Sequence, residues 1–268
     1  MLKLIEYPRS PVPYAVLEGR LPTRREIEDI KSRGLGMHWM SVPDENLDLV
    51  FLQEYSSFLQ YLSISDGRCR DVRPVTELGL LRGLSLEVDQ RVDVDLTVLD
   101  YLESFHGYHR RFESVAGCAR LKVLALQQAR GADLATLAGP IEYLELIDAK
   151  ALRTLPVFRQ PEHLTLLWIL GSRELSLSGI SENVNLQTVS LESCGQVTDA
   201  DELLKLPHLA EVGLIGCREI HPRDELLKLQ GCEISVLGRN PFDSEFRERA
   251  KAAPSSWNYY GSARKPTR

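Results

Sequence analysis

The five cysteines are the residues of this chain most suited to chemistry, as metal ligands or as disulfide partners. They are scattered along the sequence at Cys69, Cys118, Cys194, Cys217 and Cys232. A structural metal site needs ligands that converge at defined spacing, usually with a C-x-x-C pair, and this sequence contains no such pair. A free cysteine packs as a small apolar side chain, so buried turn positions are the simpler interpretation. We expect no metal and no cofactor.

Two histidines have the chemistry for acid–base catalysis. His106 and His109 flank Tyr108, and Glu103 and Asp100 lie nearby in the sequence. A histidine with a neighbouring carboxylate can act as a general base. However, the sequence reveals no serine or cysteine nucleophile with a matched partner, and it has no glycine-rich phosphate loop. We therefore expect surface histidines and a protein that is not an enzyme.

Basic residues are too dispersed to indicate a nucleic-acid surface. The 32 Lys and Arg residues are spread along the chain, and two short basic steps stand out, His109–Arg111 and Arg264, Lys265 and Arg268. Nucleic-acid-binding domains usually combine a clustered basic face with a high pI. Here the net charge is −6 and the sequence pI is about 5.6. We expect no direct contact with nucleic acid.

The first residues and the cysteine usage bear on localisation. The N-terminus lacks the long apolar run of a signal peptide, and no stretch approaches the length of a membrane span. An odd, scattered set of cysteines fits a reducing compartment better than a disulfide-rich secreted module. The sequence thus predicts a cytoplasmic protein without a membrane contact.

A repeat organises most of the chain. The hexapeptide Asp-Glu-Leu-Leu-Lys-Leu occurs at 201–206 and again at 224–229, 23 residues later. The pattern apolar-x-x-apolar-x-apolar recurs in ten copies with start-to-start spacings of 19 to 23 residues. The copies start at Met37, Leu59, Leu81, Leu102, Leu121, Ile141, Leu164, Leu186, Leu209 and Gly231. Alternating apolar positions predict a short strand with one buried face, and a return without a tight hairpin makes the strands parallel.

The clearest copies are Leu186–Val197 and Leu209–Ile220. They resemble the leucine-rich repeat family, whose unit reads L-x-x-L-x-L-x-x-N/C-x-L over about 20–29 residues, and the chain looks like a bacterial-type, stand-alone member. The resemblance implies an α/β solenoid with a curved parallel sheet on the concave face and short helices or extended returns on the convex face. Other copies depart from the pattern where Asn or Cys is usual, at Gly67, Asp89, Ala129, Ala149 and Ser172.

Three segments follow from the repeat boundaries. Residues 1–36 should form an N-terminal α/β cap, 37–240 the repeats with about ten strands, and 241–268 a C-terminal helical cap with a basic tail. Solenoids need such caps over their open ends. The C-terminal helix should start at Asp243 or Ser244 and end before Pro254.

Capping boxes predict where two other helices start. Thr23 with Glu26 predicts a helix that continues to about Lys31 and stops at Gly34. Inside the repeats, Asp199 with Glu202 predicts a capped helix over residues 200–206. In the copy that starts at Leu102, Gly107 replaces a large apolar residue, and we expect a locally irregular strand or an altered curvature there.

The strand positions that point away from the core indicate a binding surface. With the start of each copy as position one, positions two, three, five, seven and eight contain ten acidic and two basic residues, and none is basic from Ile141 to Gly238. Tryptophan and tyrosine, which are enriched at binding hot spots, also collect there. The residues predicted to bind a partner are Trp39, Tyr61, Glu87, His106, Tyr108, Glu142, Tyr143, Glu145, Trp168, Leu170, Glu192 and Glu211.

These features predict a protein-binding repeat protein without catalysis. An acidic concave face favours a partner protein with a basic face, attracted over long range. By analogy, a small acidic repeat protein of this kind resembles an inhibitor or an immunity protein for a basic toxin or enzyme. Two alternatives stay open, namely a scaffold or regulatory subunit for a signalling partner, and a leucine-rich-repeat effector with enzymatic activity.

Overall fold

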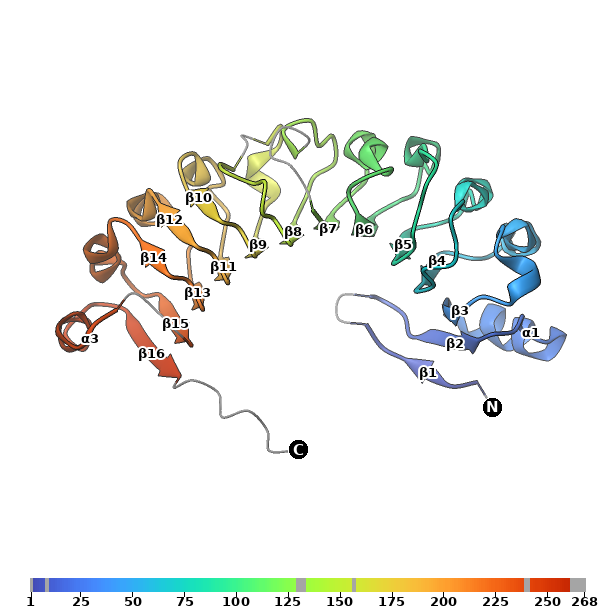
Figure 1. The fold of residues 1–268 in the computed structure, drawn as a ribbon, viewed down its shortest axis with the longest axis horizontal. Helices are drawn as coiled ribbons and strands as arrows, with labels where there is room; N and C mark the ends of the chain where they lie inside the picture. Colours follow the sequence, from blue (N-terminus) through green and yellow to red (C-terminus); the bar gives the residue numbers. More distant parts are fainter. Residues whose placement is uncertain (1, 8–9, 129–133, 156–157, 239–241, 261–268) are drawn as a thin grey trace. The chain divides into compact units, whose positions relative to one another are not determined.

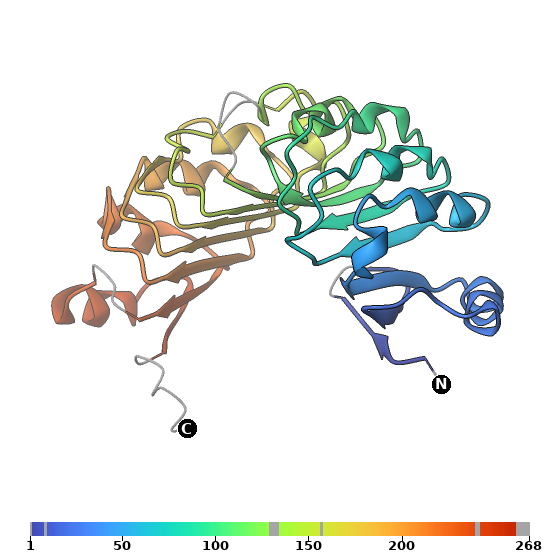
Figure 2. The ribbon, with the colours of Figure 1, turned by 45° about the vertical axis from the view of Figure 1, so that its right-hand side comes forward.

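The computed structural model describes the chain in two compact units, Met1–Leu124 and Ala125–Arg268. The boundary falls within strand β7 (Val123–Gln127). The described residues are 2–7, 10–128, 134–155, 158–238 and 242–260. Within each unit the strands of the main sheet form one side and the helical returns form the other (Figure 1). The main-sheet strands and the helical returns form separate layers in both units (Figure 2).

The N-terminal unit consists of parallel strands joined by α-helical or 3-10-helical (η) returns. Its parallel strands are β2 (Tyr14–Glu18), β3 (Gly36–Ser41), β4 (Tyr61–Ile64), β5 (Gly83–Leu86) and β6 (Ser104–Tyr108). Strand β1 (Leu4–Ile5) pairs with β2 in the antiparallel direction. The returns are α1 (Arg24–Arg33), η1 (Asp44–Asn46), η2 (Val50–Tyr55), η3 (Arg73–Glu77), η4 (Leu96–Val98) and η5 (Glu113–Gly117).

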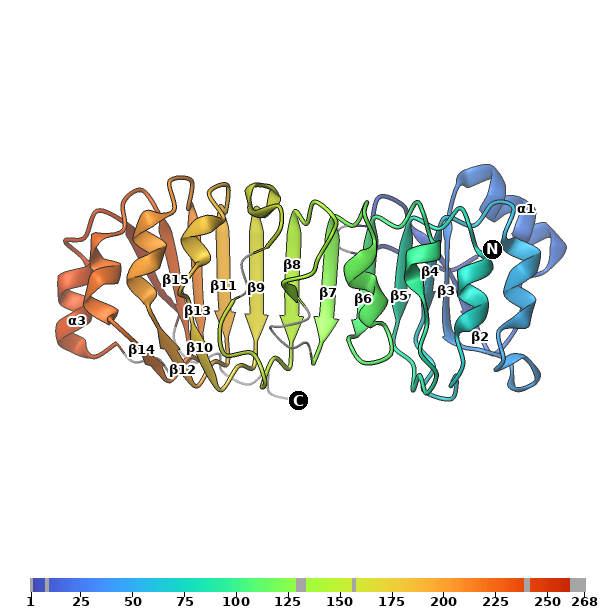
Figure 3. The same ribbon diagram turned by 90° about the horizontal axis from the view of Figure 1, so that it is seen from above.

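The C-terminal unit repeats the same plan, and its strands run side by side in one direction (Figure 3). They are β8 (Tyr143–Ile147), β9 (Leu166–Leu170), β11 (Thr188–Glu192), β13 (Glu211–Ile215), β15 (Glu233–Leu237) and β16 (Ser256–Tyr260). The returns are η6 (Pro161–His163), η7 (Ile180–Glu182), η8 (Ala200–Lys205), η9 (Arg223–Lys228) and α3 (Ser244–Ala250).

The predicted leucine positions form the core. Leu144, Leu167 and Leu191 are completely buried. Leu167 pairs with Leu144 on one neighbouring strand and with Val189 on the other, so equivalent positions of successive copies stack in register. Burial of one such side chain contributes roughly 1.5–3 kcal/mol, and each coil obtains it only from its neighbours. The predicted leucine-rich-repeat solenoid and its α/β fold class are confirmed.

The first copy shows a different register, so the prediction that places Trp39 on the strand face is wrong. Met37 pairs with Leu62 and Trp39 with Ile64, which makes Met37 and Trp39 the core positions. Trp39 is completely buried, whereas Met40 is 46% exposed. The Met-x-x-Met-x-Val spacing imitates the repeat pattern, and an odd shift in register exchanges the two faces of a strand.

Trp39 is held in the core of the N-terminal unit by two aromatic rings and one hydrogen bond. Its ring centroid lies 5.4 Å from that of Phe51 and 6.1 Å from that of Tyr55. Its Nε1 donates a hydrogen bond to the carbonyl oxygen of Arg20 at 3.3 Å. Such a tryptophan supports the first coil and offers no surface to a partner.

One of the two predicted capping boxes is confirmed and the other is wrong. Thr23 accepts from the backbone N–H of Glu26 while Glu26 accepts from Thr23, and Gly34 ends α1 in the left-handed region. The return after Asp199 is the 3-10 helix η8, without a side-chain cap. The carboxylate of Glu202 instead accepts hydrogen bonds from Ser181 and Lys205. Its partners therefore come from a neighbouring coil and from its own return.

A second sheet in the C-terminal unit is absent from the sequence prediction. Strands β10 (Glu174–Ser176), β12 (Gln196–Thr198) and β14 (Glu219–Ile220) pair in parallel beside the main strands. The buried residues Leu175, Val197 and Ile220 anchor these strands. Each follows the turn residue Ser172, Cys194 or Cys217 by three positions, which is the signal that could have predicted the sheet.

On its β5 side, the strand of the copy that starts at Leu102 is not irregular, contrary to expectation. Strand β6 pairs with β5 without a register shift, with Phe105 opposite Leu84 and Gly107 opposite Leu86. A Cβ atom at Gly107 would lie 3.0 Å from the ring of Phe105. The phenylalanine ring, which also packs against Phe112 at 5.4 Å, thus takes the space that a leucine at position six would fill.

This compensation predicts a non-additive pair of substitutions. Gly107→Leu should lower the free energy of unfolding by about 1–3 kcal/mol, because the new side chain would crowd both the Phe105 ring and the backbone carbonyl oxygen of Leu86. The double variant Phe105→Leu/Gly107→Leu restores the usual repeat pattern and should be destabilised by less than the sum of the single variants. Chemical denaturation followed by circular dichroism measures all three. Strict additivity would show that the two positions do not share one space.

The turns after the strands are tied to preceding coils through side chains. The Cys217 thiol donates to the carbonyl of Leu191 at 3.4 Å, and the Ser172 hydroxyl donates to that of Leu152 at 2.9 Å. In the N-terminal unit Asp66 has this function, since its carboxylate accepts from the backbone N–H of Val42 at 2.8 Å. In these three coils the residue type differs, but each side chain makes a hydrogen bond to a preceding coil.

Arg68 completes the link at Asp66. Its guanidinium donates to both carboxylate oxygens of Asp66, at 2.9 and 2.6 Å, and to the carbonyl of Val42 at 2.7 Å, and it also pairs with Asp44. The hydrogen bonds from Arg68, helped by the backbone N–H groups of Val42 and Arg68, lower the pKa of Asp66 to about 2. The Asp66 side chain is only 5% exposed, so its charge depends on these partners.

The depressed pKa predicts how this link responds to acid. The stabilisation from Asp66 is fully present above its ordinary pKa of 3.8 and is lost as the pH falls towards 2. Asp66→Ala should lower the free energy of unfolding by about 1–3 kcal/mol at neutral pH. The difference in this free energy between the variant and the wild type should decrease as the pH falls from 5 to 2. Urea denaturation across this range tests the prediction, with the exposed Asp89→Ala as control. A difference in unfolding free energy that stays the same across this pH range would contradict the prediction.

Candidate functional site

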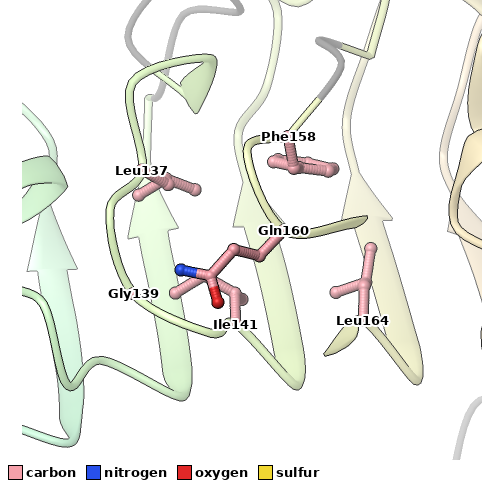
Figure 4. A pocket seen from close by; sticks show the side chains of 6 residues that line it. All are labelled: Leu137, Gly139, Ile141, Phe158, Gln160 and Leu164. Carbon is pink, nitrogen blue, oxygen red and sulfur yellow. The ribbon is translucent and has the colours of Figure 1, made fainter. Parts of the chain in front are cut away.

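The cavity shown in Figure 4 lies between the coils that start at Ile141 and Leu164. The cavity is lined by Ile141, Leu164, Leu137, Gly139, Phe158 and Gln160. Its volume is about 10 Å³. The Gln160 side-chain amide donates to the carbonyl of Ala138 at 2.9 Å. Such a volume holds at most about one water molecule, so this cavity is not a site for a small-molecule ligand.

The structure brings serines and histidines together, which the sequence did not reveal. His38 Nδ1 lies 2.8 Å from Ser63 Oγ, and His106 Nδ1 lies 3.3 Å from Ser85 Oγ. The Tyr7 hydroxyl lies 3.1 Å from the same His38 nitrogen. A serine beside a histidine can act as a nucleophile, and these pairs could not be found by sequence spacing, because the partners are 25 and 21 residues apart.

Burial argues against catalysis by the pair in the first coils. Ser63 and His38 are 2% and 4% exposed, so a substrate carbonyl has no path to the hydroxyl. Burial also lowers the pKa of His38, which keeps the ring neutral as a hydrogen-bonding group. We interpret the serine–histidine pairs as polar links across the strands of the N-terminal unit.

The cysteines are buried thiols. All five are free and buried, and burial raises the pKa of Cys69, Cys118 and Cys232 to about 11. Cys194 and Cys217 occupy equivalent turns after the paired strands β11 and β13, as expected. Within the described ranges, no group of three or more His, Cys, Asp or Glu side chains is arranged to hold a metal ion.

The predicted binding residues of the N-terminal unit do not form one patch. Tyr61 is 8% exposed, and its ring covers Gly83 on the next strand. His106 is half-buried and faces Ser85. Glu87 and Tyr108 are the exposed members of the set. Met40 is also exposed on this face, together with the basic residues Arg82 and Lys122, so the strand face of this unit is not uniformly acidic.

The strand face of the C-terminal unit is centred on Trp168. This half-buried residue lies opposite Glu145 on β8 and opposite Ser190 on β11. Beyond Ser190, the same row continues with Gly213 on β13 and Ser235 on β15. The tryptophan ring therefore stands at the end of a row of small residues. Its indole Nε1 is shielded from water and has no hydrogen-bond partner among the residues that the structure describes.

Tyr143 and Leu170 border this row in different ways. Tyr143 is 6% exposed and its hydroxyl donates to the Glu145 carboxylate at 2.7 Å, so it positions that acid and offers little surface. Leu170 is half-buried and lies opposite Glu192, which in turn lies opposite Ile215. Glu192 is thus an acid between two aliphatic side chains.

Acidic residues lie on both sides of the row that starts at Trp168. In the described strands of this unit, no basic residue occupies a position that points away from the core. Glu142 and Glu211 are exposed. Glu211 lies directly opposite Glu233 on the next strand, and like charges in that arrangement are destabilising. Asn258 donates to the Glu233 carboxylate at 2.9 Å, whereas Glu192 and Glu211 make no side-chain hydrogen bond or ion pair within the described part of the chain.

We call the surface formed by Glu142, Glu145, Trp168, Leu170, Glu192 and Glu211 the acidic strand face. All six belong to the C-terminal unit and were predicted to bind a partner. Among the helices of the described ranges, none is both long and apolar enough to cross a membrane.

Comparison with known proteins identifies the fold. No protein-family model and no curated protein sequence matches this chain. An internalin from Listeria monocytogenes superposes with a TM-score of 0.51 over 92% of this chain and 86% of its own, at 12% identity. A leucine-rich repeat protein from Leptospira interrogans has a TM-score of 0.47 over 91% of this chain and 71% of its own, at 16% identity. With the stacked leucine register and the internalin superposition, the chain is a leucine-rich repeat protein by fold.

Proposed function

We propose that this protein binds another protein through the acidic strand face and has no catalytic role. The proposal is carried by the register that places Glu211 on β13 opposite Glu233 on β15. A pair of like charges on neighbouring strands costs folding stability, and a partner with a basic face would offset that cost in the complex. Trp168 beside Glu145 adds an aromatic surface that suits the aliphatic stems and charged ends of lysine or arginine.

The proposed partner is a basic toxin or enzyme, which this protein would hold inactive as an inhibitor or immunity protein. Long-range attraction between an acidic and a basic face increases association rates. An inhibitor of a harmful enzyme profits most from rapid capture, which favours this role over a scaffold or a regulatory subunit of a signalling protein.

A charge reversal tests the proposed surface. Glu211→Lys should decrease the association rate with a partner captured from the source organism, and the loss should shrink at high salt because charges are screened. The same change places a lysine opposite Glu233, so the free energy of unfolding should rise by about 0.2–1 kcal/mol. Weaker binding combined with a more stable fold distinguishes a lost contact from a damaged protein.

The matched control is Glu182→Lys, which makes the same change in net charge at an exposed position of η7, on the return side. It should bind like the wild type. Equal binding by both variants would contradict the acidic strand face as the binding site. Assay of the captured protein then separates the roles, since loss of its activity supports an inhibitor, whereas an active complex supports a scaffold or regulatory subunit.

A further inference from the structure

The first and last strands of the sheet differ in how their outer edges are protected. Strand β1 has two residues and lies between Lys3 and Glu6. Strand β16 has five residues, none of them charged, and pairs with β15 along its whole length. Proteins usually shorten or charge an edge strand because its free backbone groups attract another strand. Strand β1 has this protection, and β16 lacks it.

The backbone of β16 has groups available on its outer edge. The backbone N–H of Ser256 donates to the carbonyl of Cys232 at 3.0 Å. Because successive residues of a strand direct their backbone groups to opposite sides, those of Ser256 and Asn258 face β15. The N–H and C=O groups of Trp257 and Tyr259 therefore point away from β15. No described strand pairs with this edge.

Two aromatic side chains of β16, Trp257 and Tyr259, also have polar atoms without a hydrogen-bond partner among the described residues. Trp257 packs against Phe242 and Phe246, with ring centroids 5.6 and 5.3 Å away, and Tyr259 stacks on Trp257 at 6.1 Å. The Trp257 Nε1 and the Tyr259 hydroxyl are shielded from water without a hydrogen-bond partner among the described residues. Buried polar groups are normally satisfied, so this end of the fold is incomplete on its own.

A groove between α3 and β16 carries charges of both signs. Its lining includes Arg247, Glu248, Trp257 and Tyr259. The Arg247 guanidinium lies 5.1 Å from the centre of the Tyr259 ring and has no ion-pair partner in the described ranges. The Glu248 carboxylate pairs with Lys251, and both side chains are 70% exposed, so this contact with water-exposed groups is weak. A mixed-charge groove suits its own copy better than a strongly acidic or basic protein.

We propose that β16 pairs with β16 of a second copy of this chain in the antiparallel direction, which makes a two-fold symmetric dimer. The outward groups of Trp257 and Tyr259 would then bond to the same strand of the second copy. Both α3 helices would lie on one side of the joined sheet, where Arg247 can meet Glu248 of the second copy. A two-fold contact uses the same edge of both copies, so the assembly ends at a dimer. An open head-to-tail oligomer would instead need β16 of one copy to pair with β1 of the next, and β1 is too short for that.

Sedimentation of the full-length protein between about 1 and 100 µM tests the dimer, because a weak specific contact has a Kd in this range. We expect a monomer–dimer equilibrium. Tyr259→Pro removes the outward N–H but leaves the bonds to β15, and it should raise the dimer Kd at least tenfold above that of Tyr259→Thr, which loses the same ring and keeps the N–H.

Charge exchange provides the second measurement. Arg247→Glu and Glu248→Arg should each weaken the dimer, and the variant that carries both changes should recover it. Thermal unfolding shows whether each variant is folded. A wild-type monomer at every concentration, oligomers larger than a dimer, or equal Kd values for Tyr259→Pro and Tyr259→Thr would overturn the proposal. These readouts need no partner protein and so do not depend on the proposed function.

Discussion

Leu167→Ala is expected to lower the free energy of unfolding by about 2–5 kcal/mol, because it opens a cavity in a core that cannot collapse around it. Leu167 is completely buried. It lies between Leu144 and Val189 on the neighbouring strands, and those strands are fixed by backbone hydrogen bonds on both sides. The loss is a large part of the stability of an ordinary domain. Urea denaturation followed by circular dichroism measures it.

The control is the adjacent residue on the same strand. Leu166 has the same side chain but points to the strand face, where it is half-buried. Leu166→Ala should therefore cost clearly less than Leu167→Ala, since less apolar surface returns to water. If Leu166→Ala were the more destabilising variant, the assignment of the two faces of β9 would be wrong.

Trp168→Ala is expected to weaken the partner complex by about 2 kcal/mol or more, which is roughly a 30-fold increase in Kd. The ring is half-buried at the end of a row of small residues, and its Nε1 has no acceptor among the described residues. Truncation removes the largest aromatic contact of the acidic strand face. Calorimetric titration with the captured partner measures the change, and the melting temperature of the free protein shows whether the fold is intact.

Val184→Ala serves as the comparison for Trp168→Ala. Val184 is 45% exposed and lies on the return side of the same unit, so its truncation should leave the Kd unchanged. Wild-type affinity of Trp168→Ala would exclude the acidic strand face as the main contact. The return side or the terminal segments would then become the surfaces to examine.

The leucine spacing predicted the fold because each core position is defined by its own coil and its immediate neighbours. Leu59, Leu124 and Leu191 could all be assigned to the core from spacing alone, and all three are buried. The prediction failed at Trp39, where Met37 and Met40 imitate the spacing and only pairing with Leu62 decides the register. A local pattern cannot supply that long-range information.

The candidate site was harder to predict because exposure depends on neighbouring side chains. Sequence positions placed Tyr61 and Tyr143 on the strand face, but both side chains are buried. The Tyr61 ring packs over Gly83, and the Tyr143 hydroxyl donates to Glu145. The opposition of Glu211 and Glu233 required the register of β13 against β15. Charge counts indicated an acidic surface, and the strand register decided which acidic residues lie opposite each other.

The buried thiols turn the wild-type chain into a set of reporters of local opening. Cys69 and Cys118 lie in the N-terminal unit, and Cys194, Cys217 and Cys232 in the C-terminal unit. An alkylating reagent reacts with a thiolate, so each thiol must first leave the core, whether by local or by global unfolding. Pulsed alkylation followed by mass spectrometry would measure when each coil opens, without an introduced label. The order in which the five thiols react is the order in which their coils come apart.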